Sequence, residues 1–148
     1  MSIFKLADNL YIAPQLSRED AAEAAGLGIQ SVICNRPDGE EPQQPAFAQV
    51  QQWLAEVGIN DTAHQPVVAP QINADDIARF KQLRTEKPAP VLAYCRTGTR
   101  CSLLWGFEQV QNGATVAEVM AAAQKAGVDL SAFEPRLQDA AQAATSGN

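Results

Sequence analysis

Apolar residues recur along the chain at two spacings, which predict two kinds of element. Short apolar runs, some of them alternating with polar residues, predict β-strands at residues 3–6, 10–13, 29–34, 59–67 and 90–94. Longer segments repeat apolar positions every three or four residues, as in the face formed by Phe47, Val50, Trp53, Leu54 and Val57. This spacing, together with helix start and stop signals, predicts helices at residues 17–28, 46–58, 73–87, 101–113, 115–126 and 130–144.

The order of these elements predicts the fold class. After two initial strands, strands and helices alternate, and a proline-rich polar loop at residues 35–45 interrupts them once. Alternation of this kind predicts an α/β fold with a central, mostly parallel sheet flanked by helices. Binding sites in such folds lie at the carboxyl ends of the strands. Cys34 and Cys95 are both expected at that edge, each at the end of a strand.

The composition narrows the classes of function. The chain has 148 residues, 46% apolar and 19% charged, which predicts a single domain over residues 1–148. A formal net charge of -6 argues against general binding to nucleic acid or to an anionic membrane. No apolar run approaches the length of a membrane span, and the first residues lack a signal-peptide pattern, so we expect a cytoplasmic location.

The cysteines and the histidine bound the chemistry further. Cys34, Cys95 and Cys101 are too few for a disulfide framework and are expected to be reduced thiols. His64 is the only histidine, and the cysteines lack the close pairing of zinc sites. We therefore expect neither a metal site nor another cofactor.

The segment CRTGTR, from Cys95 to Arg100, joins the most strand-like run to a helix and is the strongest candidate for chemistry. Backbone N–H groups from Arg96 onward can form a concave nest for an anion, and the helix adds unpaired amides. Gly98 supplies the freedom that a tight ring needs, and Arg100 can bind two oxygens of an oxyanion. The same positive field is expected to lower the pKa of the Cys95 thiol and to favour its nucleophilic thiolate.

This loop carries a resemblance to a known family. CRTGTR, between VLAY and CSLLW, resembles the phosphate-binding loop of cysteine-dependent protein tyrosine and dual-specificity phosphatases, and residues 10–42 resemble the front half of those proteins. With the segment NRPDGEE, the sequence is similar to the phosphatase-like domain of beta-lactamase-hydrolase-like proteins over roughly residues 3–112. The resemblance implies a dual-specificity phosphatase type of fold, with C-terminal helices at 115–144 following this core. It also implies that Cys95 attacks a phosphate monoester and that Arg100 stabilises the oxygens.

Two departures from the phosphatase pattern leave other activities open. Tyr94 stands where that pattern has histidine, and Cys101 stands where it has arginine, because the arginine comes one residue early at Arg100. A loop shortened in this way resembles that of rhodaneses, in which the cysteine carries a persulfide. The alternatives are therefore sulfur transfer through a Cys95 persulfide, or a non-catalytic module that binds phosphate or sulfate.

Several side chains at the predicted edge are candidates for the general acid and for substrate binding. A phosphatase needs a general acid, and we select Asp38 over the neighbouring Glu40 and Glu41. Asp61 is a further candidate, whereas Asp75 and Asp76 are interpreted as stabilising a helix N-terminus and His64 as a strand-end histidine. Substrate binding is assigned to a set of residues at the same edge, namely Arg36, Arg96, Thr97, Gly98 and Thr99.

The sequence also leads to expectations for the other two thiols, the substrate and a partner. Cys101 is expected to pack inward at the start of its helix, and a reversible bond between Cys34 and Cys95 is a further hypothesis. We expect the substrate to be a small anion or a phosphoprotein. The resemblance also implies a hydrolase or persulfide-oxidising partner, because related domains are fused to hydrolases.

Overall fold

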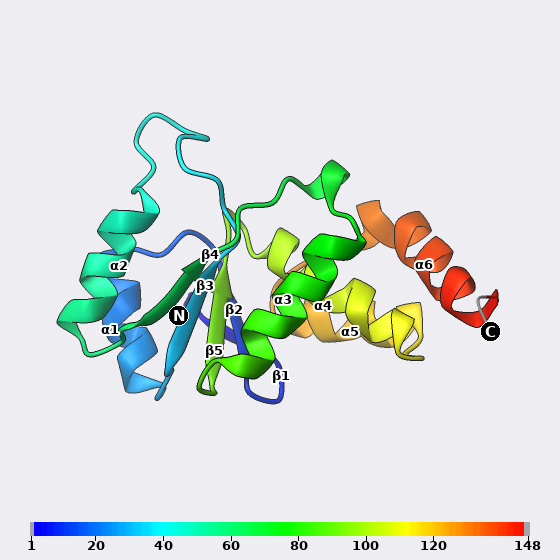
Figure 1. The fold of residues 1–148 in the computed structure, drawn as a ribbon, viewed down its shortest axis with the longest axis horizontal. Helices are drawn as coiled ribbons and strands as arrows, with labels where there is room; N and C mark the ends of the chain where they lie inside the picture. Colours follow the sequence, from blue (N-terminus) through cyan, green and yellow to red (C-terminus); the bar gives the residue numbers. More distant parts are fainter. Residues whose placement is uncertain (1, 147–148) are drawn as a thin grey trace.

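A five-stranded sheet lies at the centre of the structure, a computed structural model that describes residues 2–146 and the side chains of residues 2–144 (Figure 1). The strands are β1 (Phe4–Ala7), β2 (Leu10–Ala13), β3 (Ser31–Cys34), β4 (Asp61–His64) and β5 (Val91–Tyr94). Their order across the sheet is β1-β2-β5-β3-β4, with β1 antiparallel to β2 and the other pairings parallel. The mostly parallel α/β fold expected from the sequence is confirmed.

Helices follow the strands at nearly the predicted positions. They are α1 (Arg18–Gly26), α2 (Phe47–Glu56), α3 (Ala74–Glu86), α4 (Thr99–Gln111), α5 (Val116–Lys125) and α6 (Glu134–Ser146). Short 3-10 turns occupy Ala69–Gln71 and Ser131–Phe133. The second turn replaces the beginning of the last predicted helix, so α6 starts later than the sequence pattern suggested.

Reciprocal capping boxes fix the start of three of these helices. Ser17 accepts a hydrogen bond from the Asp20 amide, and the Asp20 carboxylate accepts one from the Ser17 amide. Asn73 and Asp76 form the same reciprocal pair before α3, and Thr115 and Glu118 form it before α5. Each pair satisfies two of the backbone donors that a helix start leaves unpaired.

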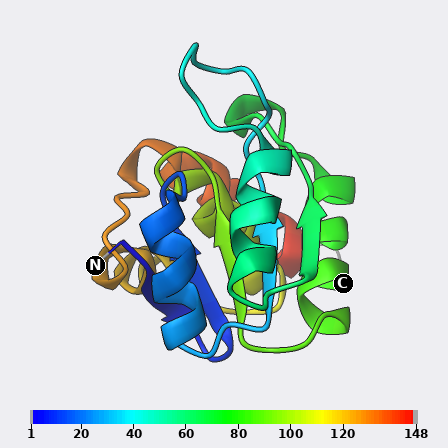
Figure 2. The same ribbon diagram turned by 90° about the vertical axis from the view of Figure 1, so that its left-hand side faces the viewer.

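The helices pack on the two faces of the sheet and bury two apolar clusters. Helices α1 and α2 lie side by side on one face, toward the viewer in Figure 2, and cover a cluster that contains Val32, Leu54 and Leu92. Helix α4 lies on the other face, and α3, α5 and α6 contact it. The larger cluster on this side includes Phe80, Leu103 and Leu104.

Strand β5 lies in the middle of the sheet and is fully buried. All four of its residues are buried, and each is paired with β2 on one side and β3 on the other. A short apolar run buried on both faces is the expected sequence of a central parallel strand. The loop after β5 therefore starts from a rigid point between the ends of two neighbouring strands.

Candidate active site

Loops from four parts of the chain meet at the carboxyl edge of the sheet. Backbone hydrogen bonds continue past the strands, from the Asn35 amide to the Tyr94 carbonyl at 2.8 Å and from the Gln65 amide to the Cys34 carbonyl at 2.7 Å. On the other side of β5, the Gln15 amide donates to the Arg96 carbonyl at 3.2 Å. These bonds hold the Cys95 loop in the expected place, at the edge where binding sites of parallel sheets lie.

Cys95 lies at the floor of this loop. The thiol is buried, and the Gly98 amide donates a hydrogen bond to its sulfur at 3.1 Å. Gly98 has φ of +87°, which L side chains rarely adopt, and it precedes the first turn of α4. This turn aims the backbone N–H groups at the sulfur. Since α4 begins at Thr99 and not at Cys101, Thr99 and Arg100 belong to the helix.

The pKa of the Cys95 thiol falls from 9.0 to about 6. The largest cause of this fall is hydrogen bonding by the Cys101 thiol. Burial raises the pKa and partly offsets the fall, whereas the backbone N–H groups of Cys101, Thr97 and Arg100 lower the pKa further. Cys95 is therefore mainly a thiolate at neutral pH, and the thiolate is the nucleophilic form of a cysteine.

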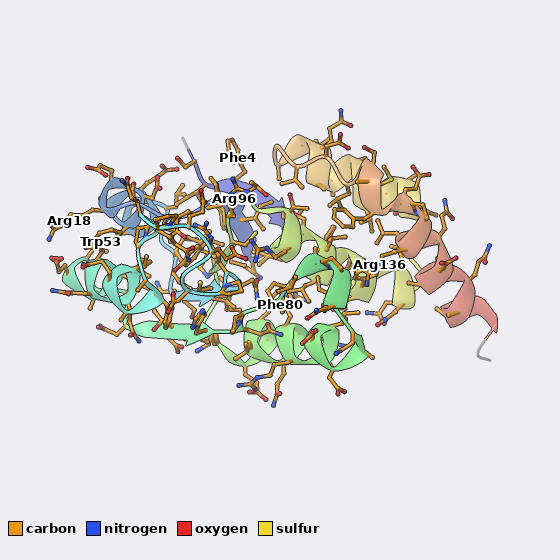
Figure 3. All side chains as sticks on the ribbon, turned by 90° about the horizontal axis from the view of Figure 1, so that it is seen from above. Phe4, Arg18, Trp53, Phe80, Arg96 and Arg136 are labelled. Carbon is orange, nitrogen blue, oxygen red and sulfur yellow. The ribbon has the colours of Figure 1, made fainter. Side chains whose placement is uncertain are left out.

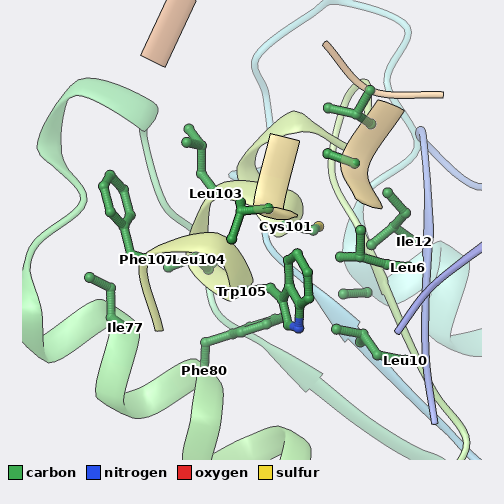
Figure 4. Close-up of a cluster of buried hydrophobic side chains, with 14 of the residues drawn as sticks. Leu6, Leu10, Ile12, Ile77, Phe80, Cys101, Leu103, Leu104, Trp105 and Phe107 are labelled. Atoms are coloured by element: carbon green, nitrogen blue, oxygen red, sulfur yellow. The ribbon is translucent and has the colours of Figure 1, made fainter. Parts of the chain in front are cut away.

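Cys101 was not selected as a site residue from the sequence, yet it is the main partner of Cys95. It is fully buried in the first turn of α4, among the apolar side chains shown in Figure 4. Burial and the neighbouring Cys95 raise its pKa well above its usual value, so Cys101 stays protonated and can donate. The inward packing expected from the sequence is present, and it also points the thiol at Cys95. The signal in the sequence was its position in the first turn after the loop.

Arg100 is held at the loop by a carboxylate from far away in the sequence. Its Nη1 and Nη2 donate to the two oxygens of Glu40 at 2.9 Å each, and Nη1 also donates to the Val67 carbonyl at 3.0 Å. Among the described residues, no acceptor is found for the Nε–H or for the second N–H of Nη2. These two donors form the other fork of the guanidinium, which suits bidentate contact with an oxyanion.

Arg36 is a buried arginine and not an ordinary surface residue. Its side chain is only 3% exposed, and its three nitrogens donate to three acceptors. Nε contacts Glu40 at 2.9 Å, Nη1 contacts Gln15 at 2.9 Å, and Nη2 contacts Glu41 at 2.6 Å. Arg96, in contrast, is 61% exposed, and its Nε lies 3.1 Å from Glu41. The structure thus brings Arg36 and Arg96 together around one carboxylate.

The carboxylates weighed as general acids have different partners. Asp38 accepts a hydrogen bond from the Phe47 amide at 2.9 Å, which caps the start of α2. Arg100, followed by Arg36, lowers the pKa of Glu40, so this group is ionised at neutral pH. Asp61 forms an ion pair with Lys87. Asp38 as the acid stays a prediction.

Other predicted residues lie at the same edge in supporting positions. The hydroxyls of Thr97 and Thr99 are 2.9 Å apart at the outer surface of the loop. The Nε2 of His64 contacts the Arg36 carbonyl at 2.8 Å, and its ring stacks on Phe47. The proposed role of His64 as a strand-end histidine agrees with these contacts.

Cys34 faces the opposite side of the sheet from the Cys101 thiol. It belongs to the cluster under α1 and α2, and its Sγ donates to the Arg36 carbonyl at 3.4 Å. The Tyr94 hydroxyl also acts on it through a hydrogen bond. Burial raises the pKa of the Cys34 thiol to about 11, so it remains protonated. All three thiols are free, and the bond between Cys34 and Cys95 stays a hypothesis.

A hollow of about 590 Å³ opens beside the loop, within the size range of small-molecule sites. Its lining combines the two clustered arginines with the proline-rich loop and consists of Gln15, Arg36, Glu41, Pro42, Gln43, Gln44, Pro45, Arg96 and Thr97. We name it the Arg36–Arg96 pocket. Within residues 2–146 there is no cluster of three or more side chains that could hold a metal ion. No helix in the same range is both long and apolar enough to cross a membrane.

Solved structures of phosphatases have the same fold. P. aeruginosa TpbA, solved in complex with phosphotyrosine, superposes with a TM-score of 0.67 at 17% identity, over 97% of this chain and 90% of that one. Kinase associated phosphatase superposes with a TM-score of 0.66 at 14% identity, over 96% and 95%. At these identities the likenesses show the fold alone, and that fold is of the protein tyrosine phosphatase-like class.

Sequence comparison narrows this class to one family. The family model of the beta-lactamase hydrolase-like protein, phosphatase-like domain, matches residues 3–114, and the chain belongs to this family. A beta-lactamase hydrolase-like protein of Agrobacterium fabrum is 34% identical over 113 residues, which are 76% of this chain and 26% of that protein. The chain therefore matches about a quarter of the length of such curated relatives. A Neisseria meningitidis protein described as a candidate phosphatase is 53% identical, with a TM-score of 0.93 over 95% of this chain and 99% of that one.

Proposed function

We propose that this protein is a cysteine-dependent phosphatase that hydrolyses a phosphate monoester through a phosphocysteine intermediate. The observation that carries the proposal is Cys95, a buried thiol in a loop of inward-facing N–H groups with a pKa of about 6. The phosphatase-like family and the phosphatase fold support it.

In the first step the Cys95 thiolate attacks phosphorus, an S–P bond forms and the P–O bond to the leaving group breaks. The free fork of Arg100 and the loop amides stabilise the charge on the equatorial oxygens. Glu40 holds the opposite edge of that guanidinium, so the fork is oriented before the substrate arrives. In the second step water attacks phosphorus, the S–P bond breaks, and phosphate and the thiolate are released.

The leaving oxygen needs a proton unless the alcohol is already acidic. Glu40 is a poor donor because its two arginine partners keep it ionised. Asp38 is free of arginine contacts among the described residues and is the proposed acid. To act as the acid, Asp38 would break its hydrogen bond with the Phe47 amide or donate the proton from its other carboxyl oxygen.

Trapping of the intermediate tests the proposal. Wild-type protein is mixed in excess with p-nitrophenyl phosphate, quenched in acid, and the Cys95 peptide is weighed by mass spectrometry. We expect a phosphoryl adduct on Cys95 and one equivalent of nitrophenol, both absent in Cys95→Ser and both retained in the control Cys34→Ser. Turnover that persists in Cys95→Ser would refute a role for this thiol.

A second candidate function is sulfur transfer, and the short spacing between Cys95 and Arg100 favours it. In this reaction the thiolate attacks the outer sulfur of thiosulfate, an S–S bond forms and sulfite leaves. The Cys95 persulfide then passes its outer sulfur to cyanide or to an acceptor thiol. The same experiment with thiosulfate in place of the aryl phosphate separates the two. A persulfide without any phosphoryl adduct would select sulfur transfer, and neither adduct would select a non-catalytic anion-binding module.

The length of the relatives suggests a partner. Because the matched region is only 26% of the Agrobacterium protein, we propose that this domain works together with a hydrolase, persulfide-oxidising in the sulfur-transfer case, on the same chain or on another. Co-purification of the tagged chain from its own cells tests this, with Cys95→Ser as a control for partners that depend on the thiol.

A further inference from the structure

The Arg36–Arg96 pocket lies beside the reactive loop and has its own positive groups. Arg96, labelled in Figure 3, lies next to the 35–46 loop, and both line the hollow of about 590 Å³. Thr97 belongs both to this lining and to the Cys95 loop. A molecule bound at Cys95 can therefore extend directly into the pocket.

One carboxylate oxygen lies between the two arginines of this pocket. Oε1 of Glu41 is 2.6 Å from Nη2 of Arg36 and 3.1 Å from Nε of Arg96. This is the geometry in which two guanidinium groups bind an external anion. Arg36 is almost completely buried and also held by Glu40 and Gln15, so its positive charge stays at the pocket whether or not Glu41 is present.

Glu41 is held much less firmly than the arginine that it contacts. Its side chain is 50% exposed, and it lies on a loop that continues through Pro42 and Pro45. Its partner Arg96 is 61% exposed, and exposed ion pairs contribute little net free energy. An incoming anion that takes over the contact with the buried Arg36 can therefore replace Glu41, because that arginine keeps a negatively charged partner. Glu40 differs, because it joins Arg36 to Arg100 and positions both.

We propose that the Arg36–Arg96 pocket is a second anion subsite, which binds an acidic group of the substrate other than the group that reacts. In the free protein Glu41 occupies this subsite as an internal carboxylate. The substrate class is a small organic phosphate that also carries a carboxylate, since the volume suits a small molecule. The assignment of the phosphate end to Cys95 rests on the proposed function.

Equilibrium binding tests the subsite without any need for turnover. In a Cys95→Ser background, calorimetry compares phenyl phosphate with its 3-carboxy and 4-carboxy derivatives. Adding Glu41→Gln should tighten the binding of at least one carboxylated probe about tenfold, because its carboxylate no longer competes with that of Glu41 for the two arginines. The binding of phenyl phosphate, which has no carboxylate, should tighten less than about threefold. Adding Arg96→Gln as well should abolish most of this preference. The matched control Glu56→Gln removes an exposed carboxylate of α2 that is paired with Arg18 of α1, and it should change neither affinity.

The outcomes separate this inference from the proposed function. An equal gain for all probes in Glu41→Gln would mean a general charge effect and would overturn the subsite. The subsite would also be overturned if the preference for carboxylated probes were unchanged after Arg96→Gln, or if no carboxylated probe bound. If the carboxylated probes bind selectively but the wild-type protein never forms a phosphocysteine, the subsite is supported and the phosphatase proposal is refuted.

Discussion

The Cys101 thiol, in the first turn of α4, is the largest cause of the low pKa of Cys95. It lowers this pKa as a hydrogen-bond donor, which requires that Cys101 remain protonated. Both thiols are buried, so water does not compete for the bond. The reactivity of the loop therefore depends on a residue that never needs to touch the substrate.

Replacing Cys101 should slow the reaction of Cys95 at neutral pH. Cys101→Ala removes the donor, and we expect the pKa of Cys95 to rise by roughly one to two units. Cys101→Ser retains a donor at the same position and should stay closer to wild type. Rates of Cys95 alkylation by iodoacetamide between pH 5 and pH 9 report this titration by peptide mass spectrometry. An unchanged profile in Cys101→Ala would show that the loop amides alone acidify the thiol.

The same pKa shift predicts a pH dependence of stability. The folded protein holds the pKa of Cys95 near 6, against 9.0 for the ordinary thiol, so between these values the unfolded chain binds more protons at this site. The stabilisation from this group is therefore complete above about pH 9 and is lost as pH falls through 6. Urea unfolding of wild type and Cys95→Ser at pH 6, 7.5 and 9 measures it. We expect the free energy of unfolding of wild type to increase relative to the variant as pH rises, and a constant difference would contradict this.

Removal of the buried Arg36 should destabilise the fold. Arg36→Met leaves Glu40, Glu41 and Gln15 without their shared donor. Breaking a fully buried pair costs about 3 to 5 kcal/mol, and since both carboxylates are partly exposed we expect about 2 kcal/mol. Urea denaturation measures the change. Arg18→Gln, which breaks the exposed pair with Glu56, is the matched control and should cost less than about 0.5 kcal/mol.

The role of Asp38 can be read from the dependence of rate on the leaving group. If Asp38 is the general acid, Asp38→Asn should lower kcat/KM for phenyl phosphate about a hundredfold, and much less for 2,4-dinitrophenyl phosphate, whose phenolate leaves unaided. Asparagine keeps an oxygen that can accept from the Phe47 amide, so the cap on α2 is preserved. An equal loss of kcat/KM with both substrates would mean that Asp38 has a structural role and that another group is the acid. Glu40→Gln, made in parallel, should affect both substrates alike because Glu40 positions Arg100.

Local sequence patterns were sufficient for most of the fold. The apolar run Val91–Tyr94 predicted the central strand, and the capping residues Ser17 and Asn73 predicted two helix starts that the structure confirms. These features depend on neighbours within a few residues, so a single sequence contains them. The start of α4 was placed two residues late because Thr99 and Arg100 were assigned to the loop, whereas the positive φ of Gly98 lets the helix begin immediately after it.

By itself, then, the sequence determined a sheet with a cysteine loop at its carboxyl edge, since Cys95, Gly98 and Arg100 are close along the chain. Only the tertiary structure decided what surrounds that loop. Glu40 reaches Arg100 across 60 positions, and Arg36 is buried by contacts with Gln15 and Glu41. No periodicity encodes how the 35–46 loop lies against the Cys95 loop and the first turn of α4. That placement follows from the pairing of β3 with β5, which brings both loops to the same edge and sets the charges around the thiol.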